Sequence, residues 1–330
     1  MKTFNIALVG CGTISYNHLT ALKELNNVNV VALCDIKPER AEARRTEFGL
    51  DSKIYTDYYE MLECEKLDAV HIATPHYLHA PMAIAALERD IYVCLEKPIC
   101  INREEISALL EAEKKSRASV AVSFQTRYNK ANMIAKKIAE EDGIVSAYFA
   151  LFWQRTNEYY TESGWRGFYS SEGGGVMINQ AIHSVDHLIS LLGKPVAVTA
   201  TTANHKHKGI IEVEDTCEGM VEFENGLVGN FFATNAFRGT SRTSIFIKTT
   251  NHELEVRNQK LYIDDRLVED TEEASYLGKE VYGSGHLTLI KKFYEAIETG
   301  AEMPITLESA QWPLRLLLAA YESNDKRTLV

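Results

Sequence analysis

The sequence lacks long apolar runs, paired cysteines and an excess of basic residues. No apolar stretch in its 330 residues reaches the length of a membrane span, and its start has no apolar region like that of a signal peptide. The six cysteines are scattered without a Cys-x-x-Cys pair, which is typical of reduced, buried thiols. A formal net charge of −11 argues against nucleic acid or an anionic membrane as a main partner. We therefore expect a soluble cytoplasmic protein.

The remaining composition is that of an ordinary globular protein with room for two domains. Apolar residues make up 45% and charged residues 25% of the chain. In the first part, short apolar runs alternate with helical patterns, which predicts a parallel sheet with helical crossovers. In such sheets, ligands bind beyond the carboxyl ends of the strands. The expected strands are Phe4–Val9, Val28–Cys34, Leu67–Ala73, Ile91–Leu95 and Ser119–Phe124.

A glycine turn, Gly10-Cys11-Gly12-Thr13-Ile14-Ser15, follows the first of these strands. Gly10 lets the chain turn sharply. Gly12 has no Cβ, so a pyrophosphate can approach the backbone at the start of the next helix, where unpaired N–H groups favour anions. Taken alone, the same pattern also fits an ordinary strand-to-helix turn.

Asp35 turns this pattern into a specific prediction. It ends the second strand at the distance from the glycines where an acidic residue hydrogen-bonds the ribose diol of a dinucleotide. We therefore predict a dinucleotide site that includes Gly10, Gly12, Thr13, Ile14 and Asp35. The carboxylate of Asp35 favours NAD over NADP, because it would repel a ribose 2′-phosphate.

After about residue 125 the pattern changes to glycines, a helix over Val176–Leu192 and a series of strand-like runs. We expect an open, largely antiparallel sheet with helices on one face. The fold is thus an α/β Rossmann domain over residues 1–122, followed by an α+β substrate-binding and oligomerisation domain over residues 123–330. The runs are Val145–Trp153, Val196–Ala203, Cys217–Phe223, Leu227–Thr234, Ser244–Lys248, Glu253–Val256 and Leu261–Ile263.

Lys97 is the first candidate catalytic residue. In Glu96-Lys97-Pro98 it follows a predicted strand and so lies at the ligand edge of the sheet. The proline restricts its backbone to non-helical conformations. Its ammonium group can stabilise the alkoxide that forms when a hydroxyl loses its proton. The alternative is a solvated lysine paired with Glu96.

His183 is the second candidate. At helical spacing, Asn179, His183, Asp186 and His187 share one polar face of the predicted helix, opposite an apolar stripe. A histidine titrates near neutral pH and can act as the general base that removes a hydroxyl proton. One alternative is a solvated helix face. Another is a metal site built from His183, Asp186 and His187, but no further cluster of ligands completes a metal shell, so we predict no metal site.

At this point the chain resembles the Gfo/Idh/MocA oxidoreductases over essentially its whole length. The resemblance rests on the glycine turn, Ala73–His79, Glu96-Lys97-Pro98, Trp165-Arg166, Gly173–Val176 and Ile182–Asp186. It implies a nicotinamide-dinucleotide domain and a second domain that supplies the substrate wall and usually an oligomer interface. One exposed face of the antiparallel sheet would leave a large apolar patch on a monomer, so we predict a homodimer or homotetramer. It further implies that Lys97, often before a cis proline, lies beside the reacting carbinol and that His183 is the acid/base. The residues it places along the cofactor are Thr74, Pro75, His79, Glu96 and Lys97.

One position departs from part of that family. The inositol dehydrogenase branch carries aspartate four residues before the helix histidine, where this chain has Asn179. Asparagine cannot accept a proton, so Asn179 is expected to orient the substrate, as in branches that act on amino sugars or nucleotide sugars.

Five arginines lie in segments that can face the substrate, and arginine can clamp a carboxylate or phosphate. Among these we expect Arg127 and Arg166, together with Trp165, to contact the substrate. The five are Arg127, Arg155, Arg166, Arg238 and Arg242.

The predicted activity is NAD(P)-dependent interconversion of a secondary alcohol and a ketone on a sugar, nucleotide sugar or cyclitol. A cofactor-binding sensor without turnover, or a glycosidase that uses NAD for transient oxidation, are the alternatives. The presence of both Lys97 and His183 favours the dehydrogenase.

Overall fold

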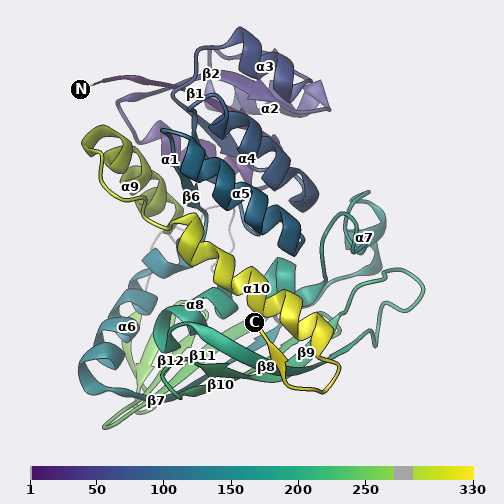
Figure 1. Cartoon of the computed structure of the whole chain (residues 1–330), viewed down its shortest axis with the longest axis vertical. Helices are drawn as coiled ribbons and strands as arrows, with labels where there is room; N and C mark the ends of the chain where they lie inside the picture. Colours follow the sequence, from purple (N-terminus) through teal and green to yellow (C-terminus); the bar gives the residue numbers. More distant parts are fainter. Residues whose placement is uncertain (1, 271–284) are drawn as a thin grey trace. The chain divides into compact units, whose positions relative to one another are not determined.

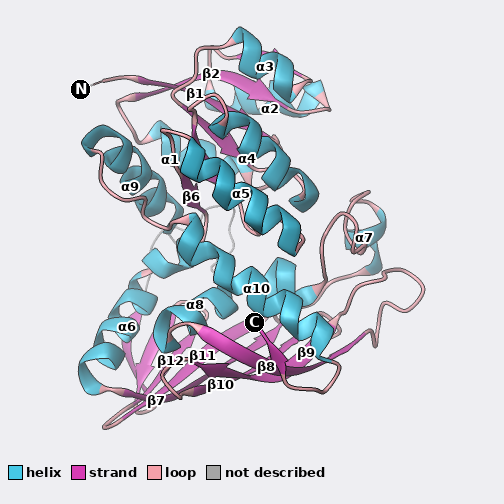
Figure 2. Cartoon of the chain, in the orientation of Figure 1, coloured by secondary structure: helices cyan, strands magenta, loops and turns pink. Residues whose placement is uncertain are grey.

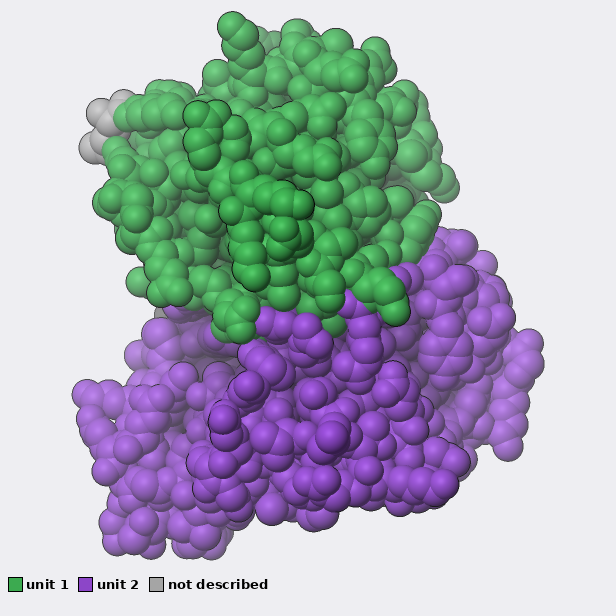
Figure 3. Space-filling view, in the orientation of Figure 1, with its two compact units in different colours: residues 1–100, 104–125, 285–310 green, residues 101–103, 126–284, 311–330 purple. Residues whose placement is uncertain are grey.

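The computed structural model describes residues 2–270 and 285–330, which form two compact units. Unit 1 comprises residues 1–100, 104–125 and 285–310, and unit 2 comprises residues 101–103, 126–284 and 311–330 (Figure 3). Within the described ranges, no helix is both long and apolar enough to cross a membrane.

Unit 1 contains a parallel sheet of six strands in the order β3-β2-β1-β4-β5-β6. This order reverses direction at β1, and helices cover both faces of the sheet (Figure 2). The parallel α/β domain predicted from the sequence is therefore confirmed. Its strands are β1 (Phe4–Val9), β2 (Val28–Cys34), β3 (Lys53–Tyr55), β4 (Ala69–Ile72), β5 (Tyr92–Leu95) and β6 (Val120–Val122). Its helices are α1 (Ser15–Lys23), α2 (Pro38–Phe48), α3 (Tyr58–Cys64), α4 (His79–Leu87), α5 (Arg103–Lys115) and α9 (Gly285–Thr299).

The unit boundaries differ from the two continuous domains that the sequence predicted. The first boundary falls at residue 125 rather than 122, and residues 285–310 return to unit 1. The physical reason is the apolar face of α9, which packs against α1 and β5. Phe293 is fully buried on that face, and the ring of Tyr294 lies 5.5 Å from that of Phe4. Sequence order alone does not show where such a late helix packs.

Unit 2 contains a nine-stranded sheet in the order β14-β13-β12-β11-β7-β10-β9-β8-β15. It is largely antiparallel, as predicted, with one parallel pair between β7 and β10. Helices α6 (Lys130–Asp142) and α8 (Ile182–Leu192) lie on the same face of it (Figure 1). The strands are β7 (Ile144–Phe152), β8 (Pro195–Ala203), β9 (Thr216–Phe223), β10 (Val228–Thr234), β11 (Arg242–Thr249), β12 (Glu253–Arg257), β13 (Lys260–Ile263), β14 (Arg266–Asp270) and β15 (Thr328–Leu329). Short α7 (Asn157–Thr161) precedes the glycine cluster, and α10 (Leu307–Ser323) precedes β15.

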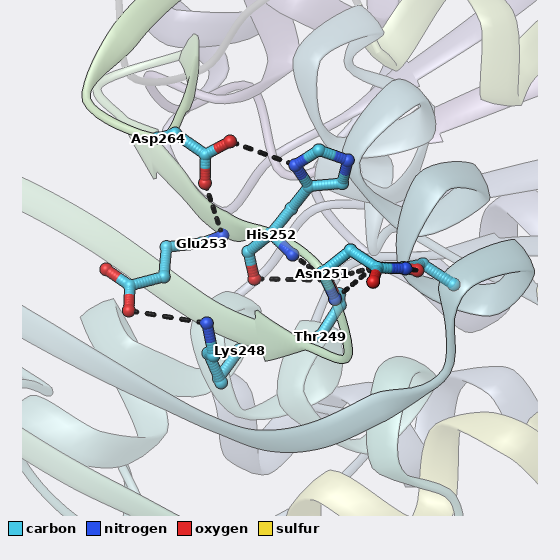
Figure 4. A network of polar contacts seen from close by, with 7 residues as sticks. Lys248, Thr249, Asn251, His252, Glu253 and Asp264 are labelled. Atoms are coloured by element: carbon cyan, nitrogen blue, oxygen red, sulfur yellow. Dashed lines mark hydrogen bonds and ion pairs between the residues drawn. The ribbon is translucent and has the colours of Figure 1, made fainter.

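Polar contacts close the hairpin between β11 and β12 (Figure 4). The carboxylate of Asp264 accepts a hydrogen bond from the backbone N–H of Glu253 at 3.0 Å and contacts the ring of His252 at 2.9 Å. The backbone N–H of Asn251 donates to Asp142 at the end of α6. These contacts join the turn between β11 and β12 to α6 and to the turn that follows β13.

The helical segment that carries Asn179 and His183 is held at its start by Glu214. The Glu214 carboxylate accepts hydrogen bonds from the backbone N–H groups of Gly175 at 2.8 Å and Met177 at 3.0 Å, and from the Tyr321 hydroxyl at 3.1 Å. The approach is so close that a Cβ on Gly175 would lie 1.8 Å from the Glu214 carbonyl oxygen. Glycine is therefore required at residue 175, and Glu214 satisfies N–H groups that the start of a helix leaves unpaired.

Burial raises the pKa of Glu214 to about 7, although its hydrogen bonds oppose the rise. An acid whose pKa is higher in the folded than in the unfolded chain stabilises the fold at low pH and loses that contribution as pH rises through the folded pKa. For Glu214 this window runs from about 4.5 to about 7. In the wild-type protein, the free energy of unfolding should fall by up to about 1 kcal/mol per pH unit as pH rises across that window. We predict that this fall is absent in Glu214→Gln.

Denaturant unfolding of wild type and variant between pH 5 and pH 8 measures this slope. Glu212→Gln is the matched control, since Glu212 is exposed two residues away. Parallel stability–pH curves for wild type and Glu214→Gln would contradict the assignment.

Candidate active site

The glycine turn after β1 has the shape that a dinucleotide needs. Gly10 has a φ of +86°, and a Cβ there would lie 2.4 Å from the Ala73 carbonyl oxygen. Gly12 faces open space, since nothing lies within 4 Å of its Cβ position. Helix α1 begins just beyond it, and no side chain caps its N-terminus. The turn therefore leaves room and N–H groups for an anion.

Asp35 lies directly beside this turn. One carboxylate oxygen accepts the Cys11 N–H at 2.8 Å, and the other accepts the Lys37 N–H at 2.9 Å. The next side chain, Ile36, is 84% exposed, so an apolar surface adjoins the carboxylate. The carboxylate can accept hydrogen bonds from a ribose diol, and the apolar surface can contact an adenine ring. Together they fit the adenosine half of an NAD molecule bound at the turn.

His79 links the loops that follow β4 and β5. Its ring is buried, with Nδ1 2.6 Å from the Pro98 carbonyl oxygen and Nε2 2.9 Å from that of Thr74. Burial lowers the pKa of His79, although both carbonyl contacts oppose this. The peptide bond between Lys97 and Pro98 is cis. Contacts of Thr74, Pro75 and His79 with a cofactor stay predictions, and the ring of His79 here supports the loop that carries Lys97.

Glu96 fixes the start of the same loop through its buried side chain. Its buried carboxylate contacts His18 Nε2 at 2.9 Å, and His286 Nε2 lies 3.8 Å from the same oxygen. Burial opposes ionisation of Glu96, but the hydrogen bond from His18 and the nearby ring of His286 outweigh it and hold its pKa well below the usual range. The ring of His18 continues to His71, which contacts the Tyr294 hydroxyl at 2.7 Å. Glu96, the residue before Lys97, is thus held in a buried position by His18.

In unit 2, the predicted helix over Val176–Leu192 contains a π-helical turn, Met177–Ala181, before α8. Its apolar stripe is buried as predicted. Asp186 and His187 lie about one turn beyond His183 on the regular helix α8, which packs against β7, β10 and α6, so the polar positions do not share one exposed face. Asn179 and His183 stay partly exposed, whereas Asp186 and His187 are buried. The stripe consists of Ile178, Ile182, Val185, Ile189 and Leu192.

The buried pair, Asp186 and His187, has structural contacts. Arg127 donates two hydrogen bonds to the Asp186 carboxylate, from Nε at 2.7 Å and from a terminal nitrogen at 2.5 Å. Burial lowers the pKa of His187 to about 3, which keeps its ring neutral. Among the described residues, His183, Asp186 and His187 do not form a compact group of metal ligands. Arg127, predicted to contact the substrate, instead secures α8, and its substrate contact stays a prediction.

Asn179 lies in a network that the sequence did not indicate. Its amide nitrogen donates to the buried carboxylate of Glu172 and lies 3.3 Å from the Tyr159 hydroxyl. Gln180 donates to the same hydroxyl at 3.2 Å and accepts a hydrogen bond from Asn235. A glutamate just before a glycine run was the available signal, because buried acids often hold the backbone N–H groups that such runs expose.

Arg155 and Arg166 both stack on Tyr159. Their guanidinium carbons lie 4.3 and 4.5 Å from the ring centre, and Arg166 also lies 4.6 Å from the ring of Trp165. In the part of the chain that the structure describes, neither arginine has a carboxylate partner, and the Nε atom of each is buried without a hydrogen bond. Such a cluster of arginines and aromatic rings suits an anionic ligand that also has an apolar ring face.

The predicted site residues therefore fall on both units. Lys97 and the dinucleotide residues belong to unit 1, whereas Arg127, Trp165, Arg166, Asn179 and His183 belong to unit 2. Lys97 and His183 are both half-buried, so each keeps part of its side chain accessible.

Family models match most of the chain. A model described as "Oxidoreductase family, NAD-binding Rossmann fold" matches residues 4–124, and the GFO/IDH/MocA C-terminal domain matches residues 139–255. The first match covers the glycine turn, Asp35 and Lys97, and the second covers Glu172, Asn179, His183 and Glu214.

Several characterised proteins are similar to this chain. An inositol 2-dehydrogenase from Salmonella typhimurium is 33% identical over 144 residues, which is 43% of each chain, so the match spans less than half of that relative. A levoglucosan dehydrogenase from Pseudarthrobacter phenanthrenivorans is 26% identical over 74% of this chain and 71% of the relative.

Among solved structures, the WlbA dehydrogenase from Bordetella pertussis, in complex with NADH and UDP-GlcNAcA, superposes with a TM-score of 0.88. It is 27% identical to this chain, and the match covers 100% of this chain and 98% of that one. The matches extend over both units and confirm the resemblance seen in the sequence. The chain belongs to the Gfo/Idh/MocA family of oxidoreductases.

Proposed function

We propose that the protein is an NAD-dependent dehydrogenase that interconverts a secondary alcohol and a ketone on a sugar, nucleotide sugar or cyclitol. The observation that carries this proposal is the pairing, in one chain, of the Asp35–glycine turn with two half-buried groups suited to proton chemistry, Lys97 and His183. The relatives named above, all dehydrogenases of sugars or inositol, support it. A sensor without turnover would need neither group, and the relatives named above are dehydrogenases, so neither the sensor nor the NAD-dependent glycosidase is favoured.

Each residue has a distinct task in this reaction. Gly10, Gly12 and the start of α1 would hold the cofactor pyrophosphate, and Asp35 would hold the adenosine ribose. When bound, NAD accepts a hydride from the substrate carbon. His183 removes the hydroxyl proton, and the ammonium of Lys97 stabilises the negative oxygen. Asn179 orients the substrate without titrating.

We further propose that the substrate carries a carboxylate or phosphate. Arg155 and Arg166 offer guanidinium groups that no described carboxylate neutralises, and Tyr159 and Trp165 beside them offer ring faces to a sugar. The WlbA structure, with its UDP-GlcNAcA ligand, supports an anionic nucleotide sugar over an uncharged cyclitol.

The six cysteines are all in the free thiol form, which suits the reducing cytoplasm that we propose as the location of the protein.

We also propose that the protein forms a homodimer or homotetramer through the sheet of unit 2. Tyr148 and Met220 on that sheet are 45% and 40% exposed, and a hollow of about 350 Å³ lies among β7, β8, β9 and β10. Exposed apolar area of this kind is typically covered by a partner.

A homo-oligomer should therefore be the main species at micromolar concentration, as measured by light scattering. Met220→Lys would place a charge in the covered area and is expected to shift the population towards the monomer. A wild-type protein that is entirely monomeric would contradict this proposal.

The cofactor prediction concerns Asp35. Because its carboxylate accepts two backbone N–H groups beside the glycine turn, a 2′-phosphate there would meet a fixed negative charge. We expect NAD to bind at least about tenfold more tightly than NADP, a difference of about 1.4 kcal/mol. Fluorescence titration with both cofactors measures this preference, and tighter binding of NADP would overturn it.

The catalytic prediction concerns His183 and Lys97. Loss of a positioned general base lowers the rate by about 10² to 10⁴. We expect His183→Ala and Lys97→Ala each to reduce kcat by that order on the true substrate, with the NAD dissociation constant nearly unchanged. Steady-state rates of NADH formation and NAD titration measure the two effects. A His183→Ala variant with normal turnover would show that another group is the base.

A further inference from the structure

Ser15 occupies the position where dinucleotide-binding turns usually carry a third glycine. Its hydroxyl is buried and donates a hydrogen bond to the Gly12 carbonyl oxygen at 2.6 Å. The same hydroxyl accepts a hydrogen bond from Nε of Arg44 at 3.0 Å. Arg44 lies on α2, so a helix outside the glycine turn contacts the turn through Ser15.

Arg44 also contacts the turn directly. One terminal guanidinium nitrogen donates to the Gly12 carbonyl oxygen at 3.1 Å, and the other pairs with the Glu47 carboxylate. The guanidinium carbon lies 5.7 Å from the ring centre of Tyr16 on α1. Each of the three guanidinium nitrogens therefore has a partner in the protein, and Glu47 balances the charge of the group.

These contacts fix the peptide plane between Gly12 and Thr13. This peptide bond is trans, so the Thr13 N–H points in the direction opposite to the Gly12 carbonyl group. Because Ser15 and Arg44 hold the carbonyl group on their side, the N–H points away from them. In the part of the chain that the structure describes, the Thr13 N–H has no acceptor. It is thus available to an anion beside the open space at Gly12.

The turn is held from outside at two neighbouring places. Asp35, just after β2, accepts the Cys11 N–H at 2.8 Å, and Arg44 on α2 holds the Gly12 carbonyl group. Glycines leave a backbone free to adopt many conformations when no such contacts restrict it. A turn that already has its bound conformation loses less conformational entropy when a ligand binds, which increases the affinity.

We propose that Arg44 is a positioning residue for NAD: through Ser15 and the Gly12 carbonyl group, it keeps the Thr13 N–H directed at the cofactor pyrophosphate. This inference rests on the proposed NAD site at the turn and adds a determinant of cofactor affinity that acts from α2. Ser15 is the link in this arrangement, since a glycine at residue 15 would offer Arg44 no side chain to contact.

A direct electrostatic role for Arg44 makes different predictions. If its charge attracted the phosphates, Arg44→Lys would keep much of the affinity, and Glu47→Gln would strengthen binding by removing the balancing charge. In the positioning role, a planar guanidinium bridges Ser15 Oγ and the Gly12 carbonyl oxygen, a geometry that an ammonium group does not reproduce. Arg44→Lys should then bind NADH about as weakly as Arg44→Met, and Glu47→Gln should not strengthen binding.

The main experiment measures the NADH dissociation constant by fluorescence titration for wild type, Arg44→Met, Ser15→Ala and the double variant. Arg44→Met removes every donor of the side chain, and we expect the dissociation constant to rise about tenfold, as when hydrogen bonds from a charged group are lost. Ser15→Ala should raise it about threefold, since the direct contact between Arg44 and Gly12 remains. The double variant should lose no more than about twofold beyond Arg44→Met, because both changes act on one peptide plane.

Arg45→Met is the matched control. Arg45 is the next residue on α2, its side chain is 40% exposed, and it pairs with Glu42 at 2.7 Å. The substitution therefore removes the same charge from the same helix without changing a contact of the turn. Its NADH dissociation constant should stay within about twofold of the wild-type value.

Two further measurements separate positioning from a general loss of structure. Thermal unfolding without cofactor measures the stability of each variant, and all titrations are made well below the lowest melting temperature. In Arg44→Met, the KM for NAD should rise with the dissociation constant, whereas kcat at saturating NAD should stay within about twofold of wild type. A purely structural role would lower the melting temperature and leave the dissociation constant unchanged.

Four results would overturn the inference: a folded Arg44→Met variant with the wild-type dissociation constant, an equal loss in Arg45→Met, tight binding by Arg44→Lys, or stronger binding by Glu47→Gln. Absence of NADH binding to wild type would contradict both the inference and the proposed cofactor site. Weaker binding by Arg44→Met and Arg44→Lys, without turnover by any of the proteins, would support the inference and contradict the proposed dehydrogenase.

Discussion

The candidate site depends on buried carboxylates that accept backbone N–H groups. Glu214 holds the N–H groups of Gly175 and Met177, and Glu172 holds that of Gly167 together with the Asn179 amide. Each carboxylate is desolvated, a cost that hydrogen bonds offset only in part at Glu214, whose pKa is still raised. Their positions set where the π turn begins, and so where Asn179 and His183 lie. The glycines follow from this arrangement, because a Cβ at residue 175 would occupy the place of the Glu214 carbonyl oxygen.

In unit 1, buried acidic side chains likewise hold the loops that carry the expected ligand-binding residues. Asp35 ties the glycine turn to the end of β2, and His18 holds Glu96, the residue before Lys97. In both units an acid on one element determines the path of a loop on another. The residues expected to touch ligands are thus supported by groups that need not touch them, which is how a rigid site is built.

The sequence predicted the fold well where periodicity is strong and local. The parallel strands of unit 1, the glycine turn, and the apolar stripe from Ile178 to Leu192 are all confirmed. It did not predict the return of α9 to unit 1, since only tertiary packing decides which core receives Phe293. The expected polar face was wrong for Asp186 and His187, because α8 packs against α6 as well as the sheet and both side chains are buried. The glycine run after Glu172 was a signal for its role, whereas Glu214 could not be identified from sequence, since its N–H partners lie far from it along the chain.

We propose that this chain oxidises a secondary alcohol on an acidic sugar. The most direct measurement is the initial rate of NADH formation with a nucleotide-linked sugar acid and with its neutral counterpart. The arginines stacked on Tyr159 predict NADH formation with a higher kcat/KM for the acid. Tight NAD binding with no NADH formed from either sugar would contradict the account.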